Sequence, residues 1–166
     1  MSRGFVKEDD LELAGTELPE RPISELPNYV TAKGLAQLKE SENALLDERE
    51  LLTQKKEDPS AVQRLAMVDR DLRYVQARLE QAILVETPKD KAPTTVVFGT
   101  TVTVEDDEGE QHHFQIVGED EADIALNTVS YASPLAKALI GHKVGDSVRW
   151  MRPAGDLNLE IMTITY

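Results

Sequence analysis

Leucine recurs every seven residues in two neighbouring stretches of the chain. The first stretch holds Leu38, Leu45 and Leu52, and the second holds Leu65, Leu72 and Leu79. Such spacing is typical of a helix that packs one apolar side against a partner helix. Taken from the outside inward, the two sets lie at equal distances from the bond between Asp58 and Pro59. This symmetry predicts an antiparallel helical hairpin that folds back at that bond.

The residues at each predicted helix start are suited to capping. Thr31 can accept a hydrogen bond from an early backbone N–H, so the first helix is expected over Ala32–Glu57. Asp58 can cap a second helix, and Pro59 fits its first turn, where a missing N–H costs nothing. The second helix is therefore expected over Pro59–Leu84.

The predicted hairpin occupies residues 29–85 and has its tip at residues 57–60. With a rise of about 1.5 Å per residue, it would be roughly 40 Å long. A second apolar row, Val68, Val75 and Ala82, runs beside the leucines of the second helix. The apolar rows of the two helices form the seam of the hairpin and pack against each other. Because no apolar row is left for a second chain, we expect a monomer rather than a coiled coil that self-associates.

The segments on either side of the hairpin contain proline. Residues 1–28 are acidic, and the stretch 17–27 holds three prolines, so we expect a mostly extended or disordered tail. Residues 86–93 contain two more prolines and are expected to form a linker. The chain thus divides into a tail, a hairpin, a linker and a C-terminal domain over residues 94–166.

The C-terminal domain replaces the helical period by alternation of apolar and polar positions, which predicts a β-sheet. The expected strands are Val96–Val104, His112–Val117, Ile124–Ser130, Ser147–Met151 and Leu157–Tyr166. Pro134 opens a short helix, Leu135–Ile140, that Gly141 ends. The predicted fold class is therefore α+β, with an N-terminal antiparallel α-helical hairpin followed by a β-sheet domain that carries one short helix.

The composition restricts the classes of partner. A formal net charge of −13 over 166 residues disfavours broad binding of nucleic-acid phosphates. Residues 29–85, with nine basic and ten acidic side chains, are near balance. The absence of cysteine excludes disulfides and thiolate zinc sites. Without a long apolar run or a signal-peptide stretch, we expect a cytoplasmic protein that does not contact a membrane.

Five motifs of the C-terminal domain resemble those of a known family. They are Val97–Val104, Ile116–Asp123, Val129–Gly141, Val144–Asp146 and Pro153–Gly155, in this order. Together with the preceding hairpin, they resemble the bacterial Gre (GreA/GreB) transcript-cleavage factors. The resemblance implies an FKBP-like fold for the C-terminal domain, and a transcription elongation factor that is not itself an enzyme.

The resemblance also implies RNA polymerase as the partner. The C-terminal domain would dock at the rim of the polymerase secondary channel, and the coiled coil would enter it, with only indirect contact to nascent RNA and DNA. In the family, acidic residues at the tip help to hold a second Mg²⁺ at the polymerase active site, which promotes cleavage of backtracked RNA. The factor would share that Mg²⁺ and have no cofactor of its own.

The tip departs from the family pattern, Gly-Asp-Leu-x-Glu-Asn. Here Lys55–Ser60 has the sequence Lys-Lys-Glu-Asp-Pro-Ser, and the hairpin is shorter. Glu57 and Asp58 are the candidate Mg²⁺ ligands in trans. In the alternative interpretation, Asp58 caps the second helix and Glu57 is a solvated charge. Stimulation of cleavage therefore stays open beside a non-cleaving role, in which the protein occludes the channel or competes with other factors.

A second candidate site precedes the short helix. Ser130, Ser133 and Pro134 correspond to the loop that docks on the polymerase in the family. Ser133 and Pro134 also suit a plain helix start, and both interpretations can hold together. A prolyl isomerase is a further alternative, but it would need an aromatic-lined apolar pocket. The domain offers Phe98, Phe114, Tyr131, Trp150 and Tyr166, several of them at core-like positions.

Other polar clusters have simpler explanations. His112 and His113 are neighbours on one predicted strand, so their side chains point to opposite faces and are expected at the surface. The acidic run Glu105–Glu108 lacks the spacing of a calcium loop and is expected to be a solvated turn. The hairpin arginines Arg64, Arg70, Arg73 and Arg78 would meet polymerase or RNA, or would pair with acidic neighbours on the helix surface.

Overall fold

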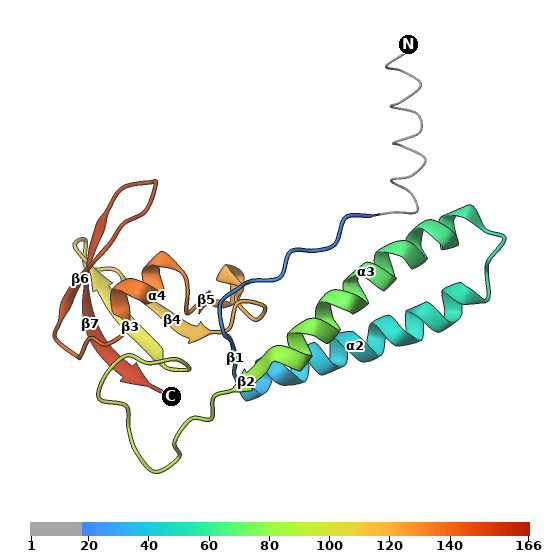
Figure 1. Ribbon diagram of the computed structural model, residues 1–166. Coiled ribbons are helices and arrows are strands. Elements are labelled where there is room, and N and C mark those ends of the chain that lie inside the picture. The colour runs from blue at the N-terminus through green and yellow to red at the C-terminus, as the bar shows by residue number, and fades with distance from the viewer. Residues whose placement is uncertain (1–17) are drawn as a thin grey trace. The chain divides into compact units, whose positions relative to one another are not determined.

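The computed structural model describes residues 18–166, so residues 1–17 of the predicted acidic tail lie outside the described residues (Figure 1). The described chain forms two compact units. The first contains residues 18–27 and 36–81, and the second contains residues 28–35 and 82–166. Among the described helices, none is long and apolar enough to cross a membrane.

Two long helices, α2 (Ala32–Thr53) and α3 (Pro59–Gln81), run antiparallel as the leucine pattern predicts (Figure 1). Val68 is fully buried, Leu38, Leu72 and Val75 are nearly so, and Leu45, Leu52, Leu65 and Leu79 are half-buried. An ion pair between Arg49 and Asp69, 2.7 Å apart, crosses between the helices. These two residues lie equally far from Pro59, which agrees with the predicted fold-back point.

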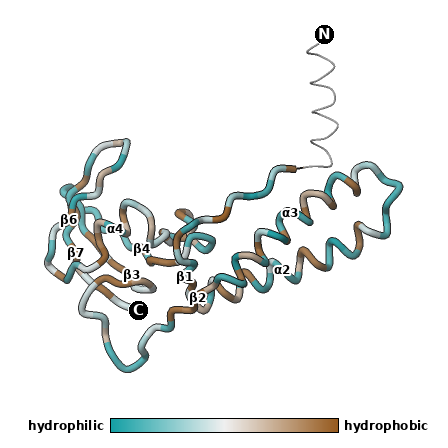
Figure 2. The backbone as a smooth tube through the Cα atoms, viewed as in Figure 1, coloured by the Kyte–Doolittle hydropathy of each residue, from teal (hydrophilic) through white to brown (hydrophobic). Residues whose placement is uncertain are grey.

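The prediction that the first helix continues to Glu57 is wrong, because α2 ends at Thr53. The backbone N–H groups of Gln54 and Lys55 donate to carbonyls three residues back, which tightens the last turn and ends the helix. The segment that follows is hydrophilic throughout (Figure 2). It therefore has no apolar side chain to bury in the seam.

Residues 18–27 form neither helix nor strand, but they contact α3. The Arg21 guanidinium lies 3.8 Å from the centroid of the Tyr74 ring and 3.4 Å from the Asp71 carboxylate. Beside it, Glu20 accepts hydrogen bonds from Arg73. We call residues 18–27 the arm. This part of the predicted tail is thus held on the hairpin by charged and aromatic contacts.

The second unit contains a pair of short parallel strands that the sequence analysis missed. Strand β1 (Asn28–Val30) pairs with β2 (Ala82–Leu84), with Tyr29 opposite Ile83. The prediction that the second helix extends to Leu84 is therefore wrong. The apolar residues of β2 suit a strand as well as a helix, and pairing with β1 decides between the two. Immediately after β1, the Thr31 hydroxyl accepts from the Gly34 N–H at 3.0 Å, as predicted for a helix cap.

The main sheet has five strands in the order β5-β4-β3-β7-β6. The strands are β3 (Thr101–Asp106), β4 (Gln111–Val117), β5 (Thr128–Ser130), β6 (Ser147–Trp150) and β7 (Leu157–Thr165). Neighbours are antiparallel except β4 and β5, which are parallel. Helix α4 (Pro134–Leu139) contributes Leu135, Ala136 and Leu139 to the buried core of this sheet. The predicted α+β class is confirmed.

Two predicted strands begin later than expected. Residues 96–100 precede β3 as a turn, in which Gly99 has φ of 89° and the Thr100 hydroxyl donates to the Val97 carbonyl at 2.7 Å. Residues 124–126 form a short 3-10 helix, η1 (Ile124–Leu126), rather than strand. The Asp123 side chain caps this turn, and Asn127 ends it in the left-handed region. Local side-chain hydrogen bonds thus replace strand pairing at both places.

Candidate functional site

The tip of the hairpin is a short exposed turn between the two helices. The Asp58 N–H donates to the Lys55 carbonyl at 3.1 Å, and the Asp58 carbonyl accepts from Val62 at 3.1 Å. One Asp58 carboxylate oxygen accepts from the Ser60 N–H at 2.9 Å. Asp58 therefore caps α3, and Pro59 occupies the first position of that helix.

Both candidate metal ligands, Glu57 and Asp58, are exposed. A carboxylate has about four lone-pair positions, so the single capping bond of Asp58 leaves acceptor capacity for a cation. The donor set is therefore two adjacent carboxylates, one of them fixed by the cap. Hard oxygen ligands of this kind suit Mg²⁺. The assignment of Glu57 and Asp58 as ligands stays a prediction.

Arginines along the hairpin are engaged by acidic side chains. Arg64 binds Glu48 of the other helix through two hydrogen bonds, of 2.5 and 3.0 Å. The hydrogen bonds from Arg64 hold the pKa of the Glu48 carboxyl below its ordinary value, and Glu48 raises the pKa of Arg64. Arg73 is held by Glu20 of the arm, and Arg78 is buried. These contacts favour the pairing interpretation of the arginines. The partner lies on the other helix for Arg64, on the arm for Arg73, and next to it on α3 for Arg70, which pairs with Asp71.

The loop before α4 is organised by its two serines. The Ser130 hydroxyl accepts from the Ala132 N–H at 3.1 Å, and the Ser133 hydroxyl accepts from Ala136 at 3.2 Å. Ser133 is thus the N-cap of α4, and Pro134 is the exposed residue that follows it. The helix start predicted at Ser133 and Pro134 is confirmed. Their role in docking stays a prediction, with Pro134 as the most exposed member of the set.

An aromatic cluster includes the residue that follows Ser130. The Tyr131 ring meets Tyr29 at 5.3 Å and Phe98 at 5.9 Å between centroids, both edge to face. Tyr29 belongs to β1, so this strand helps to fix the candidate docking loop. Tyr29 was not among the predicted site residues, because no helix or strand was predicted before Thr31. The signal available was the apolar pair Tyr29-Val30 directly after the prolines.

The second unit also has an open cleft of about 450 Å³. Its lining combines Lys33 and Lys89 with Glu86 and Glu121, and Tyr166 is its aromatic residue. Phe98, Tyr131, Phe114 and Trp150 instead pack among other rings of the described domain. A cleft of this composition does not favour a prolyl isomerase.

The family model of the C-terminal region of the transcription elongation factors GreA and GreB matches residues 90–166. Transcription elongation factor GreA of Pelobacter propionicus is 41% identical over 116 residues, which cover 69% of this chain and 73% of that relative. The chain belongs to the GreA/GreB family. The resemblance drawn from the C-terminal motifs is thereby confirmed.

The similarity to GreA/GreB proteins extends into the hairpin. Transcription elongation factor GreB of Pasteurella multocida is 36% identical over 154 residues, covering 84% of this chain and 96% of that relative. A solved structure of the elongation factor GreA/GreB from Nitrosomonas europaea has 25% identity and a TM-score of 0.42, covering 84% of this chain and 99% of that chain. The sequence matches thus include more than the C-terminal domain.

Proposed function

We propose that this GreA/GreB-family protein is a transcription elongation factor that binds RNA polymerase and modulates elongation. The observation that carries the proposal is the 41% identity to a GreA over 73% of that factor. The protein is not itself an enzyme in this proposal. It acts as a monomer in the cytoplasm, where its partner works, and meets nascent RNA and DNA only within the elongation complex.

The hairpin is the element that enters the polymerase secondary channel in this proposal. Helices α2 and α3 have 22 and 23 residues. At a rise of about 1.5 Å per residue, each is about 34 Å long. The hairpin places two exposed carboxylates at its end, which supports a role for the tip rather than for the shaft. The loop with Ser130, Ser133 and Pro134 would contact the rim.

At the end of the channel, Glu57 and Asp58 would add carboxylate oxygens to a Mg²⁺ that the polymerase mainly holds. Such an ion needs only one or two carboxylates beyond its waters and other ligands. A second metal ion stabilises the attacking and leaving oxygens of a phosphoryl displacement. This chain contributes negative charge at a defined position. The hydrogen bond by which Asp58 caps α3 fixes one carboxylate at the first turn of that helix.

A second candidate function is a non-cleaving channel binder. It is favoured by the sequence Lys55–Ser60, which lacks the acidic tip pattern of the family, and by the use of Asp58 as a cap. Such a protein would occlude the channel or compete with other factors for it. Both candidates share the polymerase and the hairpin, and they differ in what the tip does.

Backtracked elongation complexes provide the test. Wild-type protein, Glu57→Gln and Asp58→Asn would be incubated with stalled complexes and Mg²⁺, and RNA length would be followed on sequencing gels. Asp58→Asn is informative because asparagine also caps helices but is a poorer metal ligand. Asp47→Asn, an exposed shaft residue, is the matched control. Co-purification with core polymerase establishes that each variant still binds.

If the protein stimulates cleavage, the wild-type protein and Asp47→Asn shorten the RNA. Both tip variants still bind, but their cleavage rate falls at least about tenfold, which is a loss of about 1.4 kcal/mol in transition-state stabilisation. The occlusion model predicts that every variant, like the wild-type protein, makes the RNA shorten more slowly than it does with polymerase alone. Full activity in both tip variants would remove the metal-ligand assignment. Failure of the wild-type protein to co-purify with core polymerase would refute the proposed function as a whole.

A further inference from the structure

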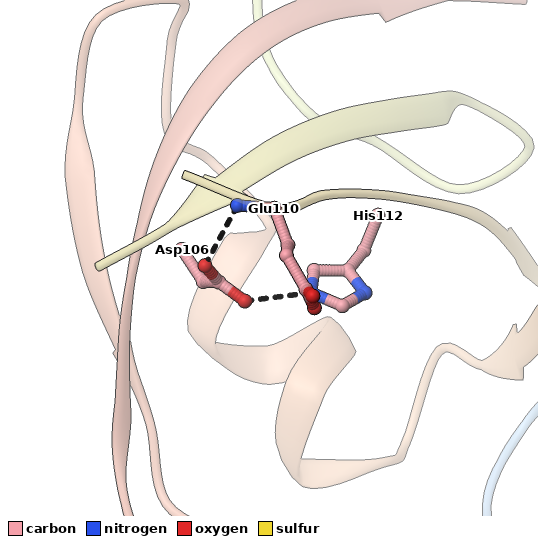
Figure 3. Close-up of side chains that lie close together, drawn as sticks. All are labelled: Asp106, Glu110 and His112. Carbon is pink, nitrogen blue, oxygen red and sulfur yellow. Dashed lines mark hydrogen bonds and ion pairs between the residues drawn. The ribbon is translucent and has the colours of Figure 1, made fainter. Parts of the chain in front are cut away.

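Three potential metal ligands converge at the turn between β3 and β4. They are Asp106 at the end of β3, Glu110 in the turn and His112 in β4 (Figure 3). One ligand atom from each lies within 4.8 Å of the other two. The closest pair is Asp106 Oδ2 and His112 Nε2, at 2.9 Å. Among the described residues, it is the only group of three or more histidine, cysteine, aspartate or glutamate side chains whose ligand atoms lie this close together.

The strand register explains why these residues meet. Val104 lies opposite His112 and Glu105 opposite Gln111, and the Asp106 N–H donates to the Glu110 carbonyl at 2.9 Å. Side chains two residues apart share a face of a strand. Asp106 therefore shares the face of Val104, and His112 shares that of Phe114. Since Val104 and Phe114 are buried in the core, the three ligands lie at the rim of the core.

Asp106 and His112 are held in place before any ion binds. The Asp106 side chain is only 6% exposed, and its Oδ1 accepts from the N–H groups of Glu108 and Glu110, at 2.9 and 3.0 Å. Its second oxygen, Oδ2, is thereby directed to His112. The His112 ring stacks on Phe114, with centroids 6.4 Å apart and planes 12° from parallel. This arrangement differs from a solvated acidic turn, in which each side chain would be free to rotate.

We propose that the β3–β4 hairpin binds a divalent transition-metal ion of borderline softness, such as Zn²⁺, through Asp106, Glu110 and His112. One imidazole nitrogen with two carboxylates is a ligand set typical of zinc and poorly suited to Mg²⁺, which prefers oxygen. The His112 Nε2 binds the ion through its lone pair, and the ring proton resides on Nδ1. The metal then takes the place of the hydrogen bond between His112 and Asp106.

The distances and the local charge fit this ion. With metal–ligand bonds of about 2.0–2.2 Å in a tetrahedral site, neighbouring ligand atoms lie roughly 3.4 Å apart. The Asp106 Oδ2 to His112 Nε2 separation is 2.9 Å, so the two atoms need to move apart by only about 0.5 Å to admit the ion. Rotation of the exposed Glu110 side chain brings in the third ligand. Water completes the coordination. The acidic turn residues Asp107 and Glu108 raise the local concentration of cations.

The neighbouring histidine provides a matched control. His113 is exposed, lies on the opposite face of β4, and has its Nε2 3.4 Å from the Asn127 side-chain amide. A His113→Gln substitution therefore makes the same chemical change one residue away without touching the proposed site. Because the chain contains no cysteine, thiolate binding contributes no background.

Isothermal titration of the untagged full chain with ZnCl₂ tests the proposal. We expect one saturable site in the wild-type protein and in His113→Gln. We expect the affinity for Zn²⁺ to fall at least about tenfold in His112→Gln and in Glu110→Gln, because loss of even a residue that only supports a metal ligand typically weakens metal binding by that much. Millimolar Mg²⁺ should not displace the bound Zn²⁺. Circular dichroism checks the fold of each variant. Because the Glu110 side chain is exposed, Glu110→Gln is the variant expected to leave the turn intact.

Three results would overturn the proposal. They are the absence of saturable Zn²⁺ binding, equal affinities in His112→Gln and His113→Gln, and displacement of Zn²⁺ by Mg²⁺. The test uses metal binding alone and does not require polymerase. Its outcome is therefore independent of the function proposed above.

Discussion

Replacement of Val68 by alanine tests whether the hairpin seam holds α2 and α3 together. Val68 is 0% exposed in the middle of α3. The substitution removes two methyl groups, which costs about 1.6 kcal/mol at roughly 0.8 kcal/mol per buried carbon. The cavity left behind adds up to about 1 kcal/mol, and the better helix propensity of alanine returns about 0.5 kcal/mol. We therefore expect a net loss of about 1–2 kcal/mol in the free energy of unfolding.

The same helix supplies a control of identical chemistry. Val62 is 40% exposed and lies six residues before Val68 on the same helix. In Val62→Ala, the smaller loss of buried area and the gain in helix propensity nearly cancel, so we expect a change within about 0.5 kcal/mol. Both variants make the same change in the unfolded chain. The difference between them therefore isolates burial at the seam.

Urea unfolding followed by ellipticity at 222 nm measures the stability of the helices. Trp150, the single tryptophan, reports separately on the sheet through its fluorescence. We expect the helical midpoint of Val68→Ala to shift to lower urea with an unchanged m-value. Equal midpoints for Val68→Ala and Val62→Ala would refute the seam as the source of hairpin stability. A shift of the Trp150 transition without a shift in ellipticity would do the same.

Two further predictions concern the close approach of β1 to the sheet and the contact of the arm with α3. A Cβ at Gly118 would overlap the backbone carbonyl of Tyr29, so Gly118→Ala should lower the thermal midpoint by several degrees, as overpacking typically costs about 1–3 kcal/mol. The hydrogen bond from Arg73 lowers the pKa of Glu20 in the folded protein. The contact therefore contributes its full stability above the pKa that Glu20 has in the unfolded chain, and this contribution is lost as the pH falls through the lowered pKa of the folded protein. NMR titration of Glu20 should show this lowered pKa, and Arg73→Gln should return it toward the ordinary range; an unchanged titration would contradict the contact.

The hairpin could be predicted from the sequence because its signals are local and repeated. Leucines such as Leu38 and Leu72 recur with the period of a helix, and Asp58-Pro59 marks the start of α3. The capping roles of Thr31 and Ser133 were predictable for the same reason, since a cap bonds to a backbone N–H three residues away. The location of the tip carboxylates follows directly from these signals.

Strands β1 and β2 of the second unit could not be predicted in this way. Tyr29 and Ile83 are opposite in β1 and β2, but they are separated by the whole hairpin in the sequence. Three-residue strands show too little alternation to be recognised, and the apolar Ile83 fits the end of a helix equally well. Parallel pairing therefore overrides a helical pattern that is otherwise continuous through α3. The aromatic cluster around Tyr131 depends on the same pairing and was missed with it.

The proposed metal ligands were not predicted from the sequence for a different reason. His112 was compared with its neighbour His113, from which it points away, whereas its partners Asp106 and Glu110 belong to the hairpin that contains it. The predicted turn around Gly109 already implied that Asp106 lies near Glu110, because an antiparallel hairpin aligns residues on the two sides of its turn. Alternation then places His112 on the face of Glu110. Potential ligands in β-hairpins are therefore better sought across the turn than along the strand.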